Sequence, residues 1–175
     1  LTIAQDYNIQ NISIENLDFS SNMGNMNAGY KGKITDDLGY QVGGTIYYYY
    51  PGWESTGYET FLGLSYKELT VTAQTLLNNV TFGNKGDTYF LATYAPALPA
   101  GFTGKAQIGA YYYGDDDEFT AKTENTFAFR HATLGLSHAL GETGANWSLD
   151  YILGGYDRTE IKQKNKVVLG LAYAF

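Results

Sequence analysis

The sequence predicts an all-β fold: a closed antiparallel transmembrane β-barrel that forms one domain over residues 1–175. Three observations predict it. Apolar residues alternate with small or polar ones in many segments, the gaps between segments are alternately short and long, and aromatic residues gather where segments end. A soluble β-sandwich shares the first property, but it has no reason to sort its loops by length or its aromatic residues into two belts.

The composition fits this fold class and excludes several others. The chain has 17 tyrosines and 21 glycines, and 44% of its residues are apolar. No run of about 18 apolar residues is present to cross a bilayer as a helix. The absence of cysteine excludes disulfides, thiolate metal sites and a cysteine nucleophile. With a net charge of −7 there is no basic stripe to neutralise phosphates, so we expect no nucleic-acid partner.

About eleven strands are expected, each of the length that a tilted bilayer-spanning strand needs. Only the segment 66–79 has a rival helical pattern, which its β-branched residues disfavour. Around residues 127–136 the apolar positions change parity, which predicts a β-bulge near Arg130; the alternative is that odd positions face outward there. The strands are expected at residues 1–7, 11–19, 26–34, 39–50, 58–66, 69–77, 88–95, 102–113, 126–138, 147–156 and 166–175.

The gaps between these strands differ in length in a regular way. Short gaps lie at residues 35–38, 67–68, 98–101 and 141–144, and they interleave with longer gaps at 20–25, 51–57, 78–87, 114–125 and 157–165. Short periplasmic turns and longer outer loops are typical of bacterial outer-membrane barrels. Aromatic residues lead into the long loops at Tyr47–Tyr50, Tyr111–Tyr113 and Tyr156, and they flank the short turns at Tyr66, Tyr94, Phe102, Trp147 and Phe175. Two such belts fit two membrane interfaces.

The last ten residues have the most typical pattern of a barrel strand. One face carries Val167, Leu169, Leu171, Tyr173 and Phe175, and the other face is small or polar, including Lys166. Outer-membrane barrels end in such a strand, with apolar residues outward and an aromatic residue last. An ordinary sandwich strand that ends in phenylalanine is the alternative. We therefore expect the bacterial outer membrane as the location, and a terminal signal for the barrel-assembly machinery formed by Leu169, Leu171, Tyr173 and Phe175.

Alternation along the other strands assigns further residues to the outward face. With Leu169 and Leu171, these residues are expected to contact the lipids of the outer membrane. They are Val42, Ile46, Leu62, Leu64, Leu149 and Leu153.

Several segments resemble the TorF family of proteobacterial outer-membrane porins. The most specific is residues 39–52, where four consecutive tyrosines precede Pro51-Gly52. The similarity extends over nearly the whole chain through residues 16–19, 28–32, 58–66 and 98–102 and the terminal phenylalanine. The resemblance implies a barrel for passive permeation, without catalytic residues. Family members usually begin with a further strand that carries a Ser-Asp-Tyr and an Arg-Gly pattern, and no such pattern precedes Leu1.

Polar residues on the expected inward face predict a lumen that selects solutes by charge and size. The alternative is that these residues pair across a narrow lumen and plug it. Both signs of charge are present in similar number, so the sequence leaves both possibilities open. The expected lumen-lining residues are Glu15, Lys31, Lys33, Glu59, Lys105, Gln107, Arg130 and Asp150.

Two other groups have a functional and an ordinary interpretation. The acidic run Asp115–Glu118 has ligands for a hard cation such as Ca²⁺, but the EF-hand spacing is absent and a solvated loop is expected. His131 and His138 lie seven residues apart, so on a strand they point to opposite faces and do not chelate one metal. No nucleophile elbow accompanies His138, so we expect no enzyme, no metal and no cofactor.

The favoured function is passive diffusion of small hydrophilic solutes. A barrel with a closed lumen, whose long loops bind a partner, is the alternative, and a barrel that hydrolyses lipid is a third class.

Bacterial single-chain barrels have an even number of strands, with both chain ends on the periplasmic side. If Phe175 lies in the periplasm, eleven strands would place Leu1 outside the cell, which breaks this rule. We therefore expect one further N-terminal strand and about twelve strands in the complete protein. The rival is that residues 1–19 form one long strand, which leaves about ten.

Overall fold

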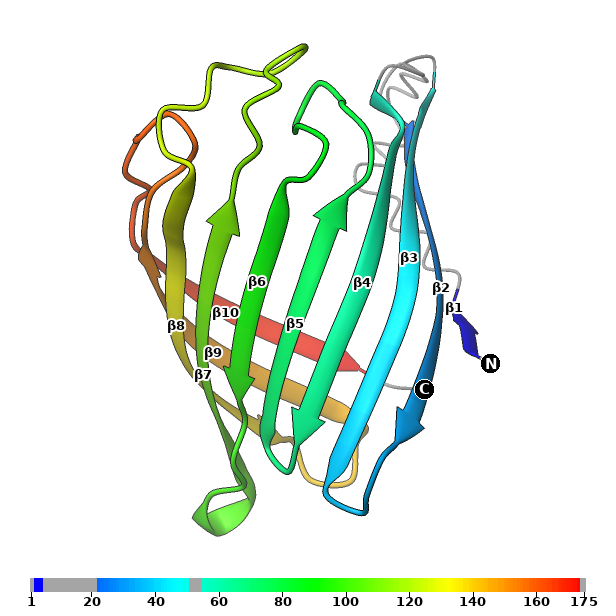
Figure 1. Ribbon diagram of the computed structural model, residues 1–175. Helices are drawn as coiled ribbons and strands as arrows, with labels where there is room; N and C mark the ends of the chain where they lie inside the picture. Colours follow the sequence, from blue (N-terminus) through cyan, green and yellow to red (C-terminus); the bar gives the residue numbers. More distant parts are fainter. Residues whose placement is uncertain (1, 5–21, 51–54, 174–175) are drawn as a thin grey trace.

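The computed structural model describes residues 2–4, 22–50 and 55–173, and these residues form one antiparallel β-sheet with the strands in chain order (Figure 1). A short 3₁₀ turn, η3 (Pro99–Gly101), precedes one of the strands. The prediction of an all-β antiparallel fold is confirmed. The strands are β1 (Thr2–Ala4), β2 (Asn22–Lys33), β3 (Leu38–Tyr50), β4 (Gly57–Tyr66), β5 (Leu69–Leu76), β6 (Thr88–Tyr94), β7 (Phe102–Tyr112), β8 (Phe127–Ala139), β9 (Ala145–Gly154) and β10 (Lys166–Tyr173). No helix in the described ranges is long and apolar enough to span a membrane.

Strands β3 to β10 match the expected strands to within two residues at each end, whereas β2 begins four residues earlier than predicted. Of the expected strand at 1–7, residues 2–4 are described; they form β1, which pairs directly with β2, with Ile3 opposite Ala28. The expected strand at 11–19 lies outside the described residues. The predicted totals of eleven and twelve strands therefore stay predictions.

The sheet is strongly curled, and β9 and β10 pass behind β5 to β7 in Figure 1. One face of the sheet is therefore convex and the other concave. In the described residues the sheet ends at β1 on one side and at β10 on the other, and no pairing joins these two edges. The described strands therefore form an open sheet, and the predicted closure of the sheet into a barrel stays a prediction.

The connections are sorted between the two ends of the sheet, as the sequence predicts. The short ones (β2–β3, β4–β5, β6–β7 and β8–β9) lie at one end, and the long loops lie at the other (Figure 1). In the turn between β8 and β9, Gly141 and Gly144 have φ angles of 60° and 77°. Glycine adopts this left-handed conformation without the strain that a side chain would add.

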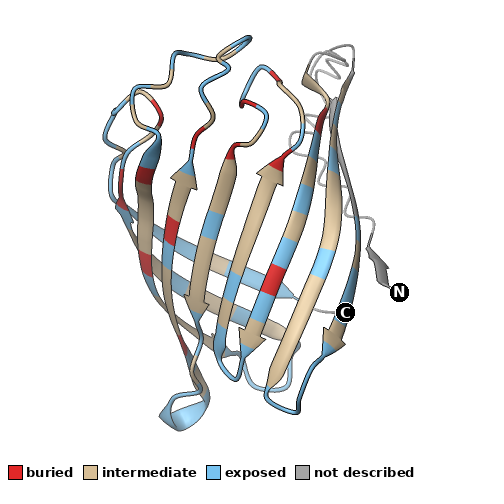
Figure 2. Ribbon diagram, viewed as in Figure 1, coloured by how far each residue is buried: buried red, intermediate tan, exposed pale blue. Residues whose placement is uncertain are grey.

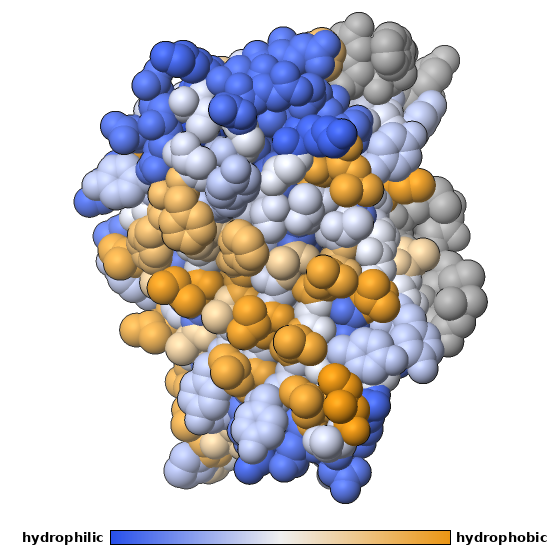
Figure 3. Space-filling model, viewed as in Figure 1, coloured by the Kyte–Doolittle hydropathy of each residue, from blue (hydrophilic) through white to orange (hydrophobic). Residues whose placement is uncertain are grey.

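The convex face carries large apolar side chains that are exposed. Leu169 and Leu171 are 76% and 75% exposed, and all eight residues predicted to face outward are exposed (Figure 2). The space-filling view shows an apolar band on the side of the molecule facing the viewer, below a strongly hydrophilic loop end (Figure 3). The buried apolar residues among those described are few: Leu76, Val80, Tyr113 and Ala128. The apolar surface therefore faces out, away from the concave side.

The predicted bulge lies at Arg130. Gly109 pairs with His131 and Ala110 pairs with Phe129, so Arg130 is an extra residue in β8. An inserted residue resets the alternation of a strand. His131 consequently faces the concave side, while Phe127 on the far side of the bulge is exposed on the convex face. Odd positions therefore face outward before the bulge, at Phe127 and Phe129, and even positions face outward after it, at Ala132 and Leu134.

The predicted aromatic belts are correct in part. Exposed tyrosines lie near the long loops (Tyr48, Tyr58 and Tyr112) and near the short turns (Tyr66, Tyr94 and Tyr173). Alternation places the neighbours Tyr47, Tyr49, Tyr111 and Tyr113 on the concave side instead. Two tyrosines of each run therefore belong to the interior of the curled sheet.

Candidate functional site

Every charged residue of the described strands lies on the concave face. Residues opposite one another in an antiparallel sheet point to the same side, and one such row runs from Lys33 through Gln107 to Lys166. Five cations and two anions share this face, which gives it a net +3 although the whole chain carries −7. The seven residues are Lys31, Lys33, Glu59, Lys105, Arg130, Asp150 and Lys166.

All the predicted lumen-lining residues within the described ranges, including Gln107, lie on this face. The predicted lumen-lining residue Glu15 lies outside those ranges, as does Phe175 of the predicted C-terminal signal. Lys166 belongs to the same set but was not among the predicted lumen residues. The alternation of the last strand, which places Lys166 opposite the apolar face, was the signal that could have added it.

Lys105 and Asp150 form an ion pair across strand β8. The Nζ atom of Lys105 lies 2.7 Å from a carboxylate oxygen of Asp150, and Gly135 lies between them in the sheet. A Cβ atom at position 135 would overlap the Asp150 carboxylate. Glycine therefore permits two charges from non-adjacent strands to meet. These two residues pair as the plug interpretation expects.

A cluster of tyrosines follows on the same face toward the long loops. Tyr89 packs on Tyr111 with ring centroids 4.9 Å apart, and Tyr111 stacks on Tyr113 at 5.0 Å with the rings almost parallel. The hydroxyl of Tyr89 lies 2.6 Å from Nε2 of His131. This cluster joins three strands by aromatic and hydrogen-bonding contacts.

Glu59 faces the same cluster from strand β4. It accepts a hydrogen bond of 3.0 Å from the hydroxyl of Tyr47. The concave face at this level is therefore a mixture of phenol rings and charged groups, rather than a continuous apolar core.

Two cavities lie on the concave face, and Arg130 lines both. One, of about 290 Å³, is lined by Glu59, Tyr89, Tyr111 and Arg158 among others. The second, of about 380 Å³, is lined by Lys105, His131, Lys164 and Lys166 among others. The sequence indicated neither cavity.

A third cavity, of about 470 Å³, lies at the short-turn end. Lys31 and Lys33 line it together with Asp36, Asp37 and Lys67. Two carboxylates line this cavity, whereas Asp150 is the one carboxylate that lines the cavity beside Lys105 and Lys166.

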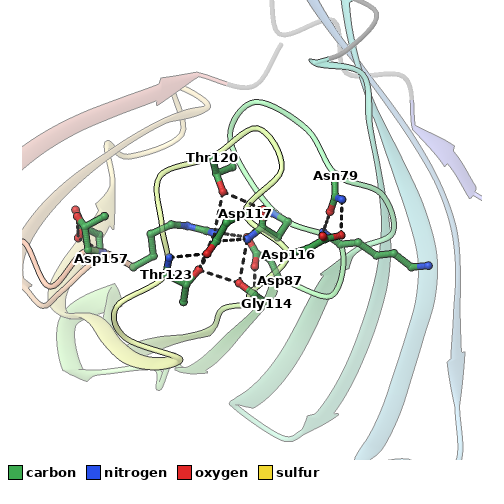
Figure 4. A network of polar contacts seen from close by, with 12 residues as sticks. Asn79, Asp87, Gly114, Asp116, Asp117, Thr120, Thr123 and Asp157 are labelled. Carbon is green, nitrogen blue, oxygen red and sulfur yellow. Dashed lines mark hydrogen bonds and ion pairs between the residues drawn. The ribbon is translucent and has the colours of Figure 1, made fainter.

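The long loops are joined to one another by a buried ion pair. The guanidinium of Arg158, in the loop between β9 and β10, contacts the carboxylate of Asp87, and both side chains are largely buried. The guanidinium also lies 3.7 Å from Asp117 and 4.8 Å from the centroid of the Tyr113 ring. Figure 4 shows Asp87, Gly114, Asp117, Thr120 and Thr123 converging on this point.

Backbone N–H groups also donate hydrogen bonds to the carboxylate of Asp87. Its carboxylate accepts hydrogen bonds from the N–H groups of Asn84 (2.9 Å) and Gly114 (2.8 Å). The fully buried Asn84 in turn donates to Asp117 at 2.8 Å and accepts from the hydroxyl of Thr120 at 2.9 Å. Because each buried polar group has a partner, the network stabilises the loop positions rather than straining them. We refer to Asp87, Asn84, Asp117, Thr123 and Arg158 as the loop network.

The acidic run is divided between solvent and the loop network. Asp116 and Glu118 are exposed, as expected, and accept hydrogen bonds from the side chain of Asn79 at 2.6 and 3.0 Å. Asp117 instead accepts from the N–H and hydroxyl of Thr123. These hydrogen bonds hold the pKa of Asp117 below its usual value.

Asp157 stabilises the neighbouring loop in a similar way. Burial raises the pKa of Asp157, but hydrogen bonds from the N–H groups of Ile161 and Thr159 outweigh it, so the net pKa is lowered. Within the described ranges no three His, Asp or Glu side chains come together to hold a metal ion.

The two histidines lie on opposite faces, as predicted. His131 faces Tyr89 on the concave side, whereas His138 packs on Phe102 with ring centroids 4.5 Å apart. Nε2 of His138 lies 3.0 Å from the carbonyl oxygen of Ala100. The environment of His138 is therefore that of an aromatic residue beside a turn.

Arg158 and Asp87 were not predicted from the sequence. The signal that could have found them is that the chain contains only two arginines, Arg130 and Arg158. Arginine is the preferred cation for buried ion pairs because its planar fork satisfies several acceptors at once.

Comparison of the chain with models of protein families, with curated proteins and with solved structures finds no match. The resemblance to the TorF family therefore depends on the segments quoted above, and it stays a prediction.

Proposed function

We propose that this chain forms a transmembrane β-barrel of the bacterial outer membrane, through which small hydrophilic solutes diffuse passively without a cofactor. One observation carries the proposal: the charged residues of the strands share the concave face, while large apolar side chains are exposed on the convex face. An exposed apolar surface of this kind is a liability in water, but it is favourable against lipid.

The proposal includes pairing between the two edges of the sheet. Unsatisfied backbone groups in hydrocarbon cost several kcal/mol each, so an open edge is incompatible with a bilayer. The strand lengths support a tilted crossing, since β3 to β5 and β7 to β9 have 8 to 13 residues. The assembly machinery would recognise the last strand through Leu169, Leu171, Tyr173 and Phe175.

A second candidate is a barrel with a closed lumen that binds a partner through its long loops. The loop network and the Lys105–Asp150 ion pair favour it, because both fill the concave side with paired groups. In this case the barrel would be a structural or interaction protein without transport.

Two measurements test these candidates in turn. A barrel should migrate differently on a denaturing gel before and after heating, and it should show β-type circular dichroism in detergent. A monomer that is soluble without detergent would contradict the membrane proposal. Single-channel recording in planar bilayers then separates the candidates: discrete conductance steps, absent with heat-denatured protein, support diffusion, and silence over many insertions supports the closed lumen.

A further inference from the structure

Arg130 is the one strand cation with a buried, unsatisfied donor in the described part of the chain. Its Nη1 atom has no hydrogen-bond partner and is shielded from solvent by the surrounding protein. None of the ion pairs between described residues includes Arg130. A buried guanidinium N–H without an acceptor is costly, and native proteins normally satisfy such groups. The missing partner is therefore an acceptor, and an anionic one satisfies a guanidinium best.

The surroundings of Arg130 favour an anion over a cation. The cavity of about 380 Å³ beside it is also lined by Lys105, Lys164 and Lys166. One carboxylate, Asp150, lines this cavity; its Oδ2 is paired with Lys105 at 2.7 Å, while its Oδ1 has no hydrogen-bond partner. The local positive charge is thus in excess even though the chain as a whole is acidic.

The other cavity at Arg130 offers hydrogen-bonding groups to such an anion. Tyr89 and Tyr111 line it, and their hydroxyls are potential donors. Three carboxylates also line this cavity, and each has a partner: Asp87 is paired with Arg158, Asp157 accepts hydrogen bonds within its own loop, and Glu59 accepts one from Tyr47. A guanidinium with several N–H groups in a planar fork matches the oxygens of a carboxylate or phosphate.

We propose that Arg130 forms a binding site for small oxyanions on the concave face, and that the permeating solutes are therefore anions that carry a carboxylate or phosphate group. The site itself follows from Arg130 and the cavities that it lines. The selection of permeating solutes rests on the proposed diffusion function.

The experiment compares three proteins in planar bilayers: the wild type, Arg130→Gln and Lys33→Gln. The control variant also removes one positive charge from the concave face, but Lys33 is exposed and lines the cavity at the short-turn end. Under a KCl gradient the wild type should favour chloride. Arg130→Gln should lower the chloride-to-potassium permeability ratio by roughly 16-fold, because a unit charge about 5 Å from an ion path in water changes the partitioning of each ion by about fourfold, in opposite directions for the two ions.

Inorganic phosphate and acetate serve as separate probes of the site. Each, added to the bath, should reduce the chloride current in a saturable way. The reduction should disappear in Arg130→Gln, weaken in Arg130→Lys, which keeps the charge but loses the fork, and persist in Lys33→Gln. A response to phosphate alone or to acetate alone identifies which oxyanion the site accepts.

Several results would overturn the proposal. They are a cation-selective wild type, or a phosphate and acetate response that Arg130→Gln leaves unchanged. Heat-modifiable migration of each variant establishes that it folds, and Arg130→Lys supplies the comparison if Arg130→Gln does not. If no protein conducts, the diffusion function fails by itself. Calorimetry with phosphate and acetate on the detergent-folded wild type and Arg130→Lys then decides the binding site: saturable binding that weakens in Arg130→Lys supports it, and no binding overturns it.

Discussion

Arg158 and Asp87 form a largely buried ion pair between two loops that lie 71 residues apart in the chain. The loop that contains Asp117 joins the same guanidinium. Three of the long loops are therefore fixed relative to one another by a single cationic side chain. The arrangement of the long-loop end of the sheet depends on this contact.

Replacing Arg158 with glutamine should destabilise the protein by about 3–5 kcal/mol, because it leaves the Asp87 carboxylate buried without its counter-charge. The free energy of unfolding in urea, measured in lipid vesicles, tests this. Lys122→Gln is the control: Lys122 is exposed and lies 3.5 Å from Glu124, so its loss should change stability by roughly 0–1 kcal/mol. Equal losses in the two variants would contradict the role of the loop network.

Leu171→Arg should cost about 2–4 kcal/mol in a bilayer, since in the proposed barrel it places a charge on the lipid side of a spanning strand. Leu171 is 75% exposed on the convex face. Gln107→Arg should cost less, because Gln107 lies on the polar concave face and donates to Thr93 at 3.0 Å. Unfolding of both variants from vesicles compares the two faces directly. If Leu171→Arg is tolerated as well as Gln107→Arg, the inside–outside assignment is wrong.

Gly135→Val should separate Lys105 from Asp150. The added side chain would occupy the position of the Asp150 carboxylate, so we expect overpacking and a loss of about 1–3 kcal/mol in the free energy of unfolding. Ala132→Val on the same strand is the matched control, because its register places it beside Ile108 on the convex face. A similar loss for both variants would mean that the volume added to β8, and not the ion pair, sets the cost.

Acid should release the loop that contains Asp117. The folded pKa of this carboxyl lies below its unfolded value of 3.8, so its contribution is fully present above that pH and is lost as the pH falls through the folded pKa. Amide exchange at Thr123 should therefore accelerate only in strong acid. Carbon NMR of the Asp117 carboxyl gives the pKa directly, and Asp117→Asn should remove this pH dependence. A measured pKa above the ordinary range would contradict the hydrogen-bonding pattern.

The strands, their two faces and the sorting of the loops could be predicted because they have a local signature. A period of two reports burial or exposure residue by residue, and it also revealed the bulge at Arg130 through a change of parity. The tyrosine runs were predicted less well, because consecutive tyrosines were assigned to one belt although neighbouring residues of a strand point to opposite faces. Tyr111 and Tyr113 were assigned to an outer belt with Tyr112, yet alternation places them inside.

The contacts of the candidate site could not be predicted, because they join residues that no period relates. Asp87 and Arg158 lie in different loops, and the chain carries no pattern that pairs one loop carboxylate with one loop arginine. The pairing of Lys105 with Asp150 needs the knowledge that both strands flank Gly135, which only the register supplies.

The bulge at Arg130 has a consequence for how densely a strand can present chemical groups. A regular strand offers one side chain to a given face roughly every 6.6 Å, because every second residue turns away. By adding a residue, β8 offers Arg130 and His131 in immediate succession to the cavity that both line. A single inserted residue thus concentrates two polar groups at one point of a surface whose spacing is otherwise fixed by the pleat.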